Sequence, residues 1–274
     1  MEDSESPPFF GYSFPPREPS AGLEMQIHLV FGHPLTTTGV VQPVALYRPR
    51  PGTFRVLRIT PETPRSDLDQ FSLMVSRARA DAIITTGQNL RLEPTGTHEI
   101  QGSGTLPQAL SAWRRETLAK TSPPHLLVLS RGKDLDLDHP AFKYRGRVFL
   151  FTSEESAFAL EAAAAERGIE VVGAAEPSPA EAVEFLRQEL GAATISVEAG
   201  PSVSRQLYDP VIVDEIQLSI FDPPDPAALP GSIRGPFFLD EARLRELYRW
   251  SPGFSETTAD GRWTFYRLER RADY

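Results

Sequence analysis

Cysteine is absent from this sequence of 274 residues. Its absence excludes disulfide scaffolds, cysteine nucleophiles and cysteine-ligated zinc or iron–sulfur sites, and it leaves the redox compartment open. The chain also lacks any apolar run of about 18 residues, the length that a membrane-spanning helix needs. Basic residues are fewer than acidic ones, 28 against 37, which gives a net charge of −9. That charge disfavours nucleic acid and anionic membranes as general partners.

The N-terminus lacks the features of a secretory signal. Residues 1–20 begin acidic and contain five prolines, whereas a signal peptide has a basic start and then an apolar stretch. We expect residues 1–20 to be a flexible tail. We expect residues 21–274 to form a single domain, since one α/β domain can reach about 250 residues. We also expect the protein to be located in the cytoplasm.

Short apolar runs alternate with helical stretches from Ala80 onward. Continuous apolar runs of this length, separated by helices, are typical of strands in a sheet covered on both faces. The runs predicted as strands are Asp81–Thr85, His125–Leu129, Arg147–Phe151, Ile169–Val172, Ala193–Val197 and Glu215–Ile220.

The helices between these strands carry clear capping signals. Ser66 precedes a helix that extends to Ala80, and Thr152 or Ser153 precedes a second, alanine-rich one. Ser178 precedes a third helix, which has proline at its first position and ends at Gly191. The alternation predicts an α/β fold with a mostly parallel sheet and helices on both faces.

The two ends of the chain are harder to interpret. Prolines interrupt residues 21–65, so the β-like runs Met25–Phe31, Val40–Leu46 and Phe54–Ile59 are predicted as antiparallel or edge strands. Near the C-terminus we predict a short helix within Leu239–Trp250 and a final strand at Trp263–Leu268.

Common nucleotide and metal motifs are missing. Gly102–Gly104 supplies two of the three glycines of a dinucleotide-binding fingerprint and follows no apolar strand. Phosphate-loop and zinc-protease motifs are absent, and His28 and His33 have no second histidine pair or carboxylate cluster nearby in sequence. We therefore predict no metal site.

The turn after Val197 is the most informative segment. A glycine at the end of a strand lets backbone N–H groups approach a pyrophosphate, and the start of the next helix favours negative charge. Gly200 occupies this position, and Ser202 and Ser204 add hydroxyl groups. Glu198 would lie at the mouth of the sheet, although a plain tight turn with an exposed carboxylate explains the spacing equally well.

This segment, ISVEAGPSVSRQLYDPVIVDEIQLSIFDP, resembles the hallmark of the reductase domain of bacterial riboflavin biosynthesis. RARADAIITTGQNLRLEP, SAWRRETLAK, HLLVLSRGKDLDLDHPAF and RVFLFTS follow the order and spacing of its stand-alone pyrimidine reductase branch. The match covers roughly residues 66–222. It implies a dihydrofolate-reductase-like three-layer sandwich with antiparallel C-terminal strands.

The resemblance also implies a function and a site. Family members transfer a hydride from NADPH to the ribosyl group of a pyrimidine phosphate, and the resemblance suggests a homodimer. Glu198 and Glu93 match acidic positions of the substrate side and are the candidate catalytic residues. Arg131 has the charge that an adenosine 2′-phosphate requires. The candidate cofactor-binding residues are Thr86, Gly87, Asn89, Ser130, Arg131, Thr152, Gly200, Pro201, Ser202 and Ser204.

The sequence departs from the family at its first strand. The Ser-Leu-Asp-Gly segment that meets the substrate is missing, and Phe54–Ile59 followed by Thr60–Thr63 occupies its place. No zinc deaminase signature is present. Three hypotheses remain open: an NADPH-dependent reductase acting on a pyrimidine or pterin, a non-catalytic nucleotide-binding protein of the same fold, and a binding module without cofactor.

Overall fold

The computed structural model describes residues 19–32, 35, 38–60, 62–100, 105–132, 135–208 and 211–272. All but the last two residues of the predicted flexible tail lie outside this part, as do Gly102–Gly104 and His33. No helix in the described ranges combines the length and apolar character needed to cross a membrane.

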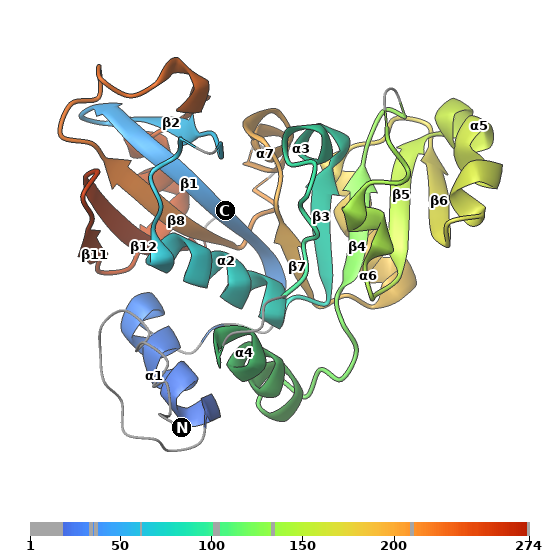
Figure 1. Cartoon of the computed structure of the whole chain (residues 1–274), viewed down its shortest axis with the longest axis horizontal. Helices are drawn as coiled ribbons and strands as arrows, with labels where there is room; N and C mark the ends of the chain where they lie inside the picture. The colour runs from blue at the N-terminus through green and yellow to red at the C-terminus, as the bar shows by residue number, and fades with distance from the viewer. Residues whose placement is uncertain are drawn as a thin grey trace, which may run out of the picture.

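The elements alternate along most of the chain (Figure 1). The helices are α1 (Pro19–Phe31), α2 (Asp67–Arg79), α3 (Gly87–Leu92), α4 (Thr105–Glu116), α5 (Glu154–Ala165), α6 (Pro179–Leu190), α7 (Pro201–Tyr208) and α8 (Glu241–Leu247), with 3-10 turns η2 (Pro140–Lys143) and η3 (Gly231–Ile233). The strands are β1 (Gly39–Arg50), β2 (Thr53–Leu57), β3 (Ala82–Thr86), β4 (His125–Leu129), β5 (Val148–Ser153), β6 (Ile169–Ala174), β7 (Thr194–Val197), β8 (Glu215–Asp222), β9 (Arg234–Asp240), β10 (Tyr248–Trp250), β11 (Phe254–Thr257) and β12 (Arg262–Arg270).

One sheet contains all twelve described strands, and its main path runs β10-β12-β8-β1-β7-β3-β4-β5-β6. The segment from β8 to β6 is parallel throughout. The C-terminal strand β12 pairs antiparallel with β8, and β10 and β11 pair antiparallel with β12. The predicted mostly parallel sheet with antiparallel C-terminal strands is therefore confirmed.

Helices cover both faces of the sheet and give three layers. Along β4, Leu127 and Leu129 pack in the core that includes α6, α7 and α8, whereas Leu126 and Val128 pack in the core that includes α3 and α5. Helix α2 lies on this second face and packs outward against α1 and α4. Because neighbouring residues of a strand point to opposite faces, strands buried on both sides need the continuous apolar runs seen in the sequence.

The predicted caps hold the helices at the expected residues. The Ser66 hydroxyl accepts from the Asp69 backbone N–H, and Ser153 caps α5 in the same way through Ser156. At α6, Ser178 and Glu181 form a reciprocal capping box, and Gly191 ends the helix in the left-handed conformation. Each such cap satisfies backbone groups that the helix itself leaves unpaired.

The predicted strand at Met25–Phe31 is wrong, because this segment belongs to helix α1. Its buried side chains are Leu23, Ile27, Val30 and Phe31. Their spacing of four, three and one residues places them on one face of a helix.

Val40–Leu46 was predicted as an antiparallel or edge strand, and the edge position is wrong. These residues belong to β1, which lies inside the sheet between β7 and β8. Residues 54–57 belong to β2, which forms an antiparallel hairpin with β1. The first strand of the sheet is therefore β1, and β2 does not take its place.

Candidate functional site

The sequence-predicted site residues gather where the parallel strands end. β3, β4, β5 and β7 end at Thr86, Leu129, Ser153 and Val197, and their parallel pairing puts these ends on one edge of the sheet. This is the edge at which open α/β sheets bind their ligands.

Two side chains at the end of β3 hold the neighbouring segments. Thr86 caps α3 by accepting from the backbone N–H of Asn89, and Asn89 Nδ2 donates to the carbonyl oxygen of Glu198 at 2.8 Å. A Cβ atom on Gly87 would lie 2.8 Å from Ser130 Oγ. Gly87 is thus required by packing against Ser130, and Asn89 connects α3 to the turn that follows β7.

That turn, residues 198–201, leads into α7. A Cβ atom on Gly200 would meet nothing nearer than Asn89 Oδ1 at 4.0 Å, so the space beside its backbone is open. Pro201 takes the first position of α7, and Ser202 is exposed. Ser204 is fully buried and hydrogen-bonds with Gln42 and the Gly200 carbonyl, so its hydroxyl is engaged within the protein.

A hollow of about 430 Å³ lies at this edge of the sheet, and it is lined by Arg131 after β4, Ser153 at the end of β5 and Glu176 after β6. Pro177, Ser178 and Gln206 complete the lining. Arg131 and Glu176 are exposed, and no ion pair joins them within the described residues. The Thr152 hydroxyl is buried at the end of β5 and has no hydrogen-bond partner in the described part of the chain.

Glu198 is held in a buried ionic cluster. Its Oε1 accepts from Arg77 Nε at 2.8 Å and its Oε2 from Arg77 Nη2 at 2.6 Å, while His98 Nδ1 lies 3.0 Å from Oε2. Burial alone would raise the pKa of Glu198, but Arg77 and then His98 outweigh it and lower the pKa to about 2. The carboxylate therefore stays ionised at neutral pH and cannot deliver or take up a proton there.

Glu93, the second predicted acid, lies at the end of α3. Its carbonyl oxygen contacts His139 Nε2 at 3.0 Å. Burial alone would lower the pKa of Arg77, but Glu198 and, to a smaller extent, the negative charge of Glu93 outweigh it and raise the pKa. Both predicted carboxylates thus act on the same guanidinium group.

Arg77 and His98 were missed by the sequence analysis. Arg77 lies in the last turn of α2, where a basic residue is common because it complements the helix dipole. His98 is buried with a φ of 55°, an unusual conformation for a residue other than glycine. The position of Arg77 at the end of the predicted helix is visible in the sequence, but its contact with Glu198 and the conformation of His98 are not. The described residues contain no group of three or more His, Cys, Asp or Glu side chains that could hold a metal ion.

A protein from Corynebacterium diphtheriae described as pyrimidine reductase-like has a similar structure, with a TM-score of 0.62, 21% identity, and coverage of 90% of this chain and 98% of that one. The chain has the pyrimidine-reductase fold. This similarity, at the level of fold, confirms the three-layer architecture implied by the resemblance to the riboflavin-pathway reductases.

Two further solved structures are similar to this fold. RibD of Acinetobacter baumannii matches with a TM-score of 0.57 and 15% identity over 86% of this chain, which spans 59% of the RibD chain. The riboflavin biosynthesis reductase Rib7 of Saccharomyces cerevisiae matches with a TM-score of 0.51 and 13% identity, covering 90% of this chain and 98% of that one. No family model and no curated protein matches the sequence.

Proposed function

We propose that this protein is an NADPH-dependent reductase that transfers a hydride to a pyrimidine ribosyl phosphate or to a related pyrimidine or pterin. The observation that carries the proposal is the arrangement at the carboxyl edge of the sheet in a reductase-like fold. There the space beside Gly200 is open, and Arg131, which has no carboxylate partner among the described residues, lines a hollow that reaches helix α7 at Gln206. The cytoplasmic location and the homodimer stay predictions.

The residues present fit a dinucleotide phosphate. The backbone at Gly200 borders open space, which a pyrophosphate needs in order to approach main-chain N–H groups. Arg131 has no carboxylate partner among the described residues and lines the hollow of about 430 Å³ at the same edge, so its guanidinium group is available for a 2′-phosphate. Ser153 borders the same hollow.

The proposed role of each residue follows from its position. The bound nicotinamide would supply the hydride. Gly200, Pro201 and Ser202 would hold the pyrophosphate at the start of α7, and Arg131 would bind the adenosine end. The described contacts of Asn89 fix the distance between α3 and this turn. The candidate roles of Thr86, Gly87, Ser130 and Ser204 are to shape this edge, since their described contacts are with the protein itself.

Glu198 takes a different role in this proposal from that of an acid or base. Its oxygens are engaged by Arg77 and His98, and its carbonyl oxygen by Asn89. We therefore assign it to positioning the turn before Gly200, while Glu93, whose carboxylate has no hydrogen bond within the described residues, is the acid better placed to face a substrate.

A specific observation favours the second candidate, a nucleotide-binding protein without catalysis. The segment by which the family's first strand meets the substrate is missing, and β1 runs instead through an arginine-rich end into the tight hairpin at Pro51–Gly52. The substrate side of this chain thus differs from the family while the cofactor side fits.

Two measurements separate these candidates. NADPH binding is followed by the change in its fluorescence on titration, and turnover by the loss of NADPH absorbance with a pyrimidine ribosyl phosphate, other pyrimidines and pterins. Binding with turnover supports the reductase, and binding without turnover on any of these substrates supports the second candidate. Absence of NADPH binding would overturn both.

A further inference from the structure

A second and larger hollow, of about 770 Å³, lies at the opposite edge of the sheet. It is bordered by the beginning of β1 at Gly39, the beginning of β8 at Glu215 and the end of the antiparallel strand β12 at Arg270. Because β1 and β8 are parallel to β7, their beginnings face away from the edge that carries the candidate cofactor site.

The lining of this hollow is richer in arginine than in acid. Among the described residues, five arginines and three acidic residues line it, an excess of two positive charges in a chain whose net charge is −9. The charged residues are Arg187, Arg249, Arg267, Arg270, Arg271, Asp214, Glu215 and Glu269.

Each of the three acids is shared between two arginines. Asp214 contacts Arg270 at 2.7 Å and Arg187 at 3.6 Å, and it also accepts from the Val40 backbone N–H at 2.8 Å. The carboxylate of Glu269 contacts Arg267 at 3.0 Å and also pairs with Arg249. One carboxylate charge balances only one guanidinium charge, so these pairs leave positive charge uncompensated.

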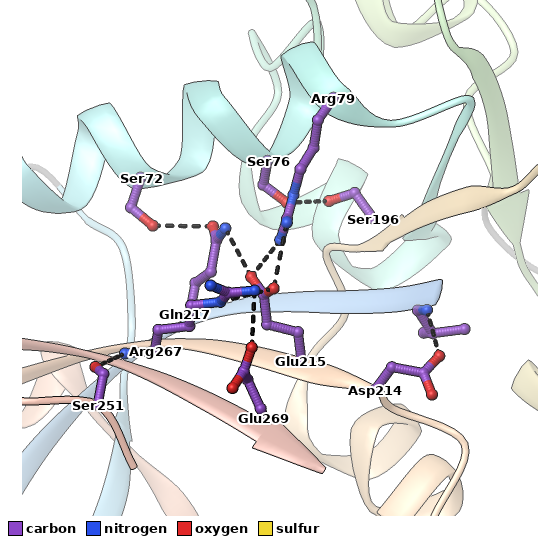
Figure 2. A network of polar contacts seen from close by, with 11 residues as sticks. Ser72, Ser76, Arg79, Ser196, Asp214, Glu215, Gln217, Ser251, Arg267 and Glu269 are labelled. Atoms are coloured by element: carbon purple, nitrogen blue, oxygen red, sulfur yellow. Dashed lines mark hydrogen bonds and ion pairs between the residues drawn. The ribbon is translucent and has the colours of Figure 1, made fainter. Parts of the chain in front are cut away.

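The third acid, Glu215, lies at the base of the hollow and is 2% exposed. Figure 2 shows Arg79 from α2 and Arg267 from β12 converging on its carboxylate, with Gln217 beside them. Arg267 is also 2% exposed, and its Nη1 has no hydrogen-bond partner among the described residues. Buried N–H donors usually have a hydrogen-bond acceptor, and the described residues provide none for this one.

Arg271 and Arg187 are the arginines of this hollow whose positive charge is least compensated by carboxylates of the described residues. Arg271 is exposed, and its Nε donates to the Arg245 carbonyl oxygen at 3.2 Å, with no carboxylate partner in the described part of the chain. Arg187, with 47% of its side chain exposed, forms an ion pair among the described residues only with Asp214, at 3.6 Å. Both guanidinium groups can therefore turn toward a ligand.

We propose that this hollow is a binding site for a small molecule that carries a di- or triphosphate group. Guanidinium groups pair with phosphate oxygens in a bidentate manner, and an excess of two positive charges among the described lining residues suits a ligand with two or more negative charges. The volume is of the size that small-molecule ligands occupy. The site lies apart from the candidate cofactor site and does not depend on it.

Inorganic pyrophosphate is the probe, titrated by calorimetry at constant ionic strength, with sodium sulfate and sodium chloride as reference ions. We expect saturable binding of pyrophosphate that is weakened at least tenfold in the Arg187→Gln/Arg271→Gln double variant. Arg147→Gln serves as the matched control, because this exposed arginine is already paired with one carboxylate, Glu170, and directly precedes β5, which is four strands away from β1 in the sheet. Its affinity should equal that of the wild type.

The variant Arg131→Ala distinguishes the two hollows, since pyrophosphate could also bind in the smaller hollow that Arg131 lines. Binding that survives Arg131→Ala and falls in the double variant supports the proposal. Binding that is lost in Arg131→Ala and kept in the double variant overturns it, as does binding no stronger than that of sulfate. If the double variant does not fold, Arg249→Gln, whose side chain is 76% exposed, replaces it.

Discussion

Replacing Glu198 by Gln keeps the shape of the side chain and removes its charge. Arg77 would then lie in the protein, with 15% of its side chain exposed, without a negative partner on either nitrogen that now binds Glu198. Breaking a buried ion pair from one side costs about 3–5 kcal/mol, because the remaining charge stays buried and uncompensated. For a chain of this length we expect the melting temperature to fall by about 5–9 °C.

The pH dependence gives an independent magnitude. The pKa of Glu198 is lowered from 4.5 to about 2, and a change of one unit corresponds to about 1.4 kcal/mol, so the ionised form contributes about 3 kcal/mol. The folded-state pKa is depressed, and this contribution is therefore fully present above pH 4.5 and is lost as the pH falls towards 2. The difference in stability between wild type and Glu198→Gln should shrink over the same window.

Urea unfolding of both proteins between pH 7 and pH 3 measures this difference. The comparison removes the titration of all other carboxylates, including Glu215, because both proteins share them. Exposed ion pairs contribute less than about 1 kcal/mol. A difference in stability below this value at pH 7 would refute the assignment of Glu198 to a buried ion pair. A difference that does not change between pH 5 and pH 3 would refute it as well.

Three further predictions test the site and the fold. Arg131→Ala should weaken NADPH binding by roughly tenfold or more while leaving NADH nearly unchanged, because an arginine–phosphate hydrogen bond contributes about 1.5–3 kcal/mol; equal losses in fluorescence titrations of both cofactors would show that Arg131 does not bind the 2′-phosphate. Gly200→Val should abolish NADPH binding with an unchanged circular dichroism spectrum, since open space in the protein surrounds the position, and normal binding would place the cofactor elsewhere. Ser178→Ala removes the capping box of α6 and should lower the free energy of unfolding by about 1 kcal/mol, whereas Ser202→Ala, at an exposed position, should leave it within about 0.5 kcal/mol.

The parallel half of the sheet could be predicted from the sequence because local signals agree there with the tertiary structure. His125–Leu129 became β4 with its predicted bounds, and Ser178, Pro179 and Gly191 delimit α6 as expected. In such segments the apolar run, the cap and the helix stop each arise from short-range physics. The bounds of these elements can therefore be predicted with little information about distant residues.

Segment 19–31 shows where the same reasoning fails. Met25–Phe31 has the apolar and β-branched residues of a strand, and only the burial of Leu23 and Ile27 reveals the helical period. Partners from α2, α4 and β12 determine this burial. The site was partly predictable for a similar reason: the Gly200 turn carries a local pattern, whereas Arg77 reaches Glu198 across 121 positions of sequence.

Proline in β1 connects the error in the fold to the position of the site. Proline cannot donate to a strand ladder, and its presence therefore predicts an antiparallel or edge strand for Val40–Leu46. In the structure, the pairing of β1 with β7 ends at Val41, and its pairing with β2 begins at Leu46. Pro43 therefore has a strand partner on the β8 side alone. At this interruption, the Gln42 side chain hydrogen-bonds with the hydroxyl groups of Ser204 and Tyr208 on α7. Helix α7, which begins at the Gly200 turn, is therefore fixed to the sheet at the interruption that accommodates Pro43.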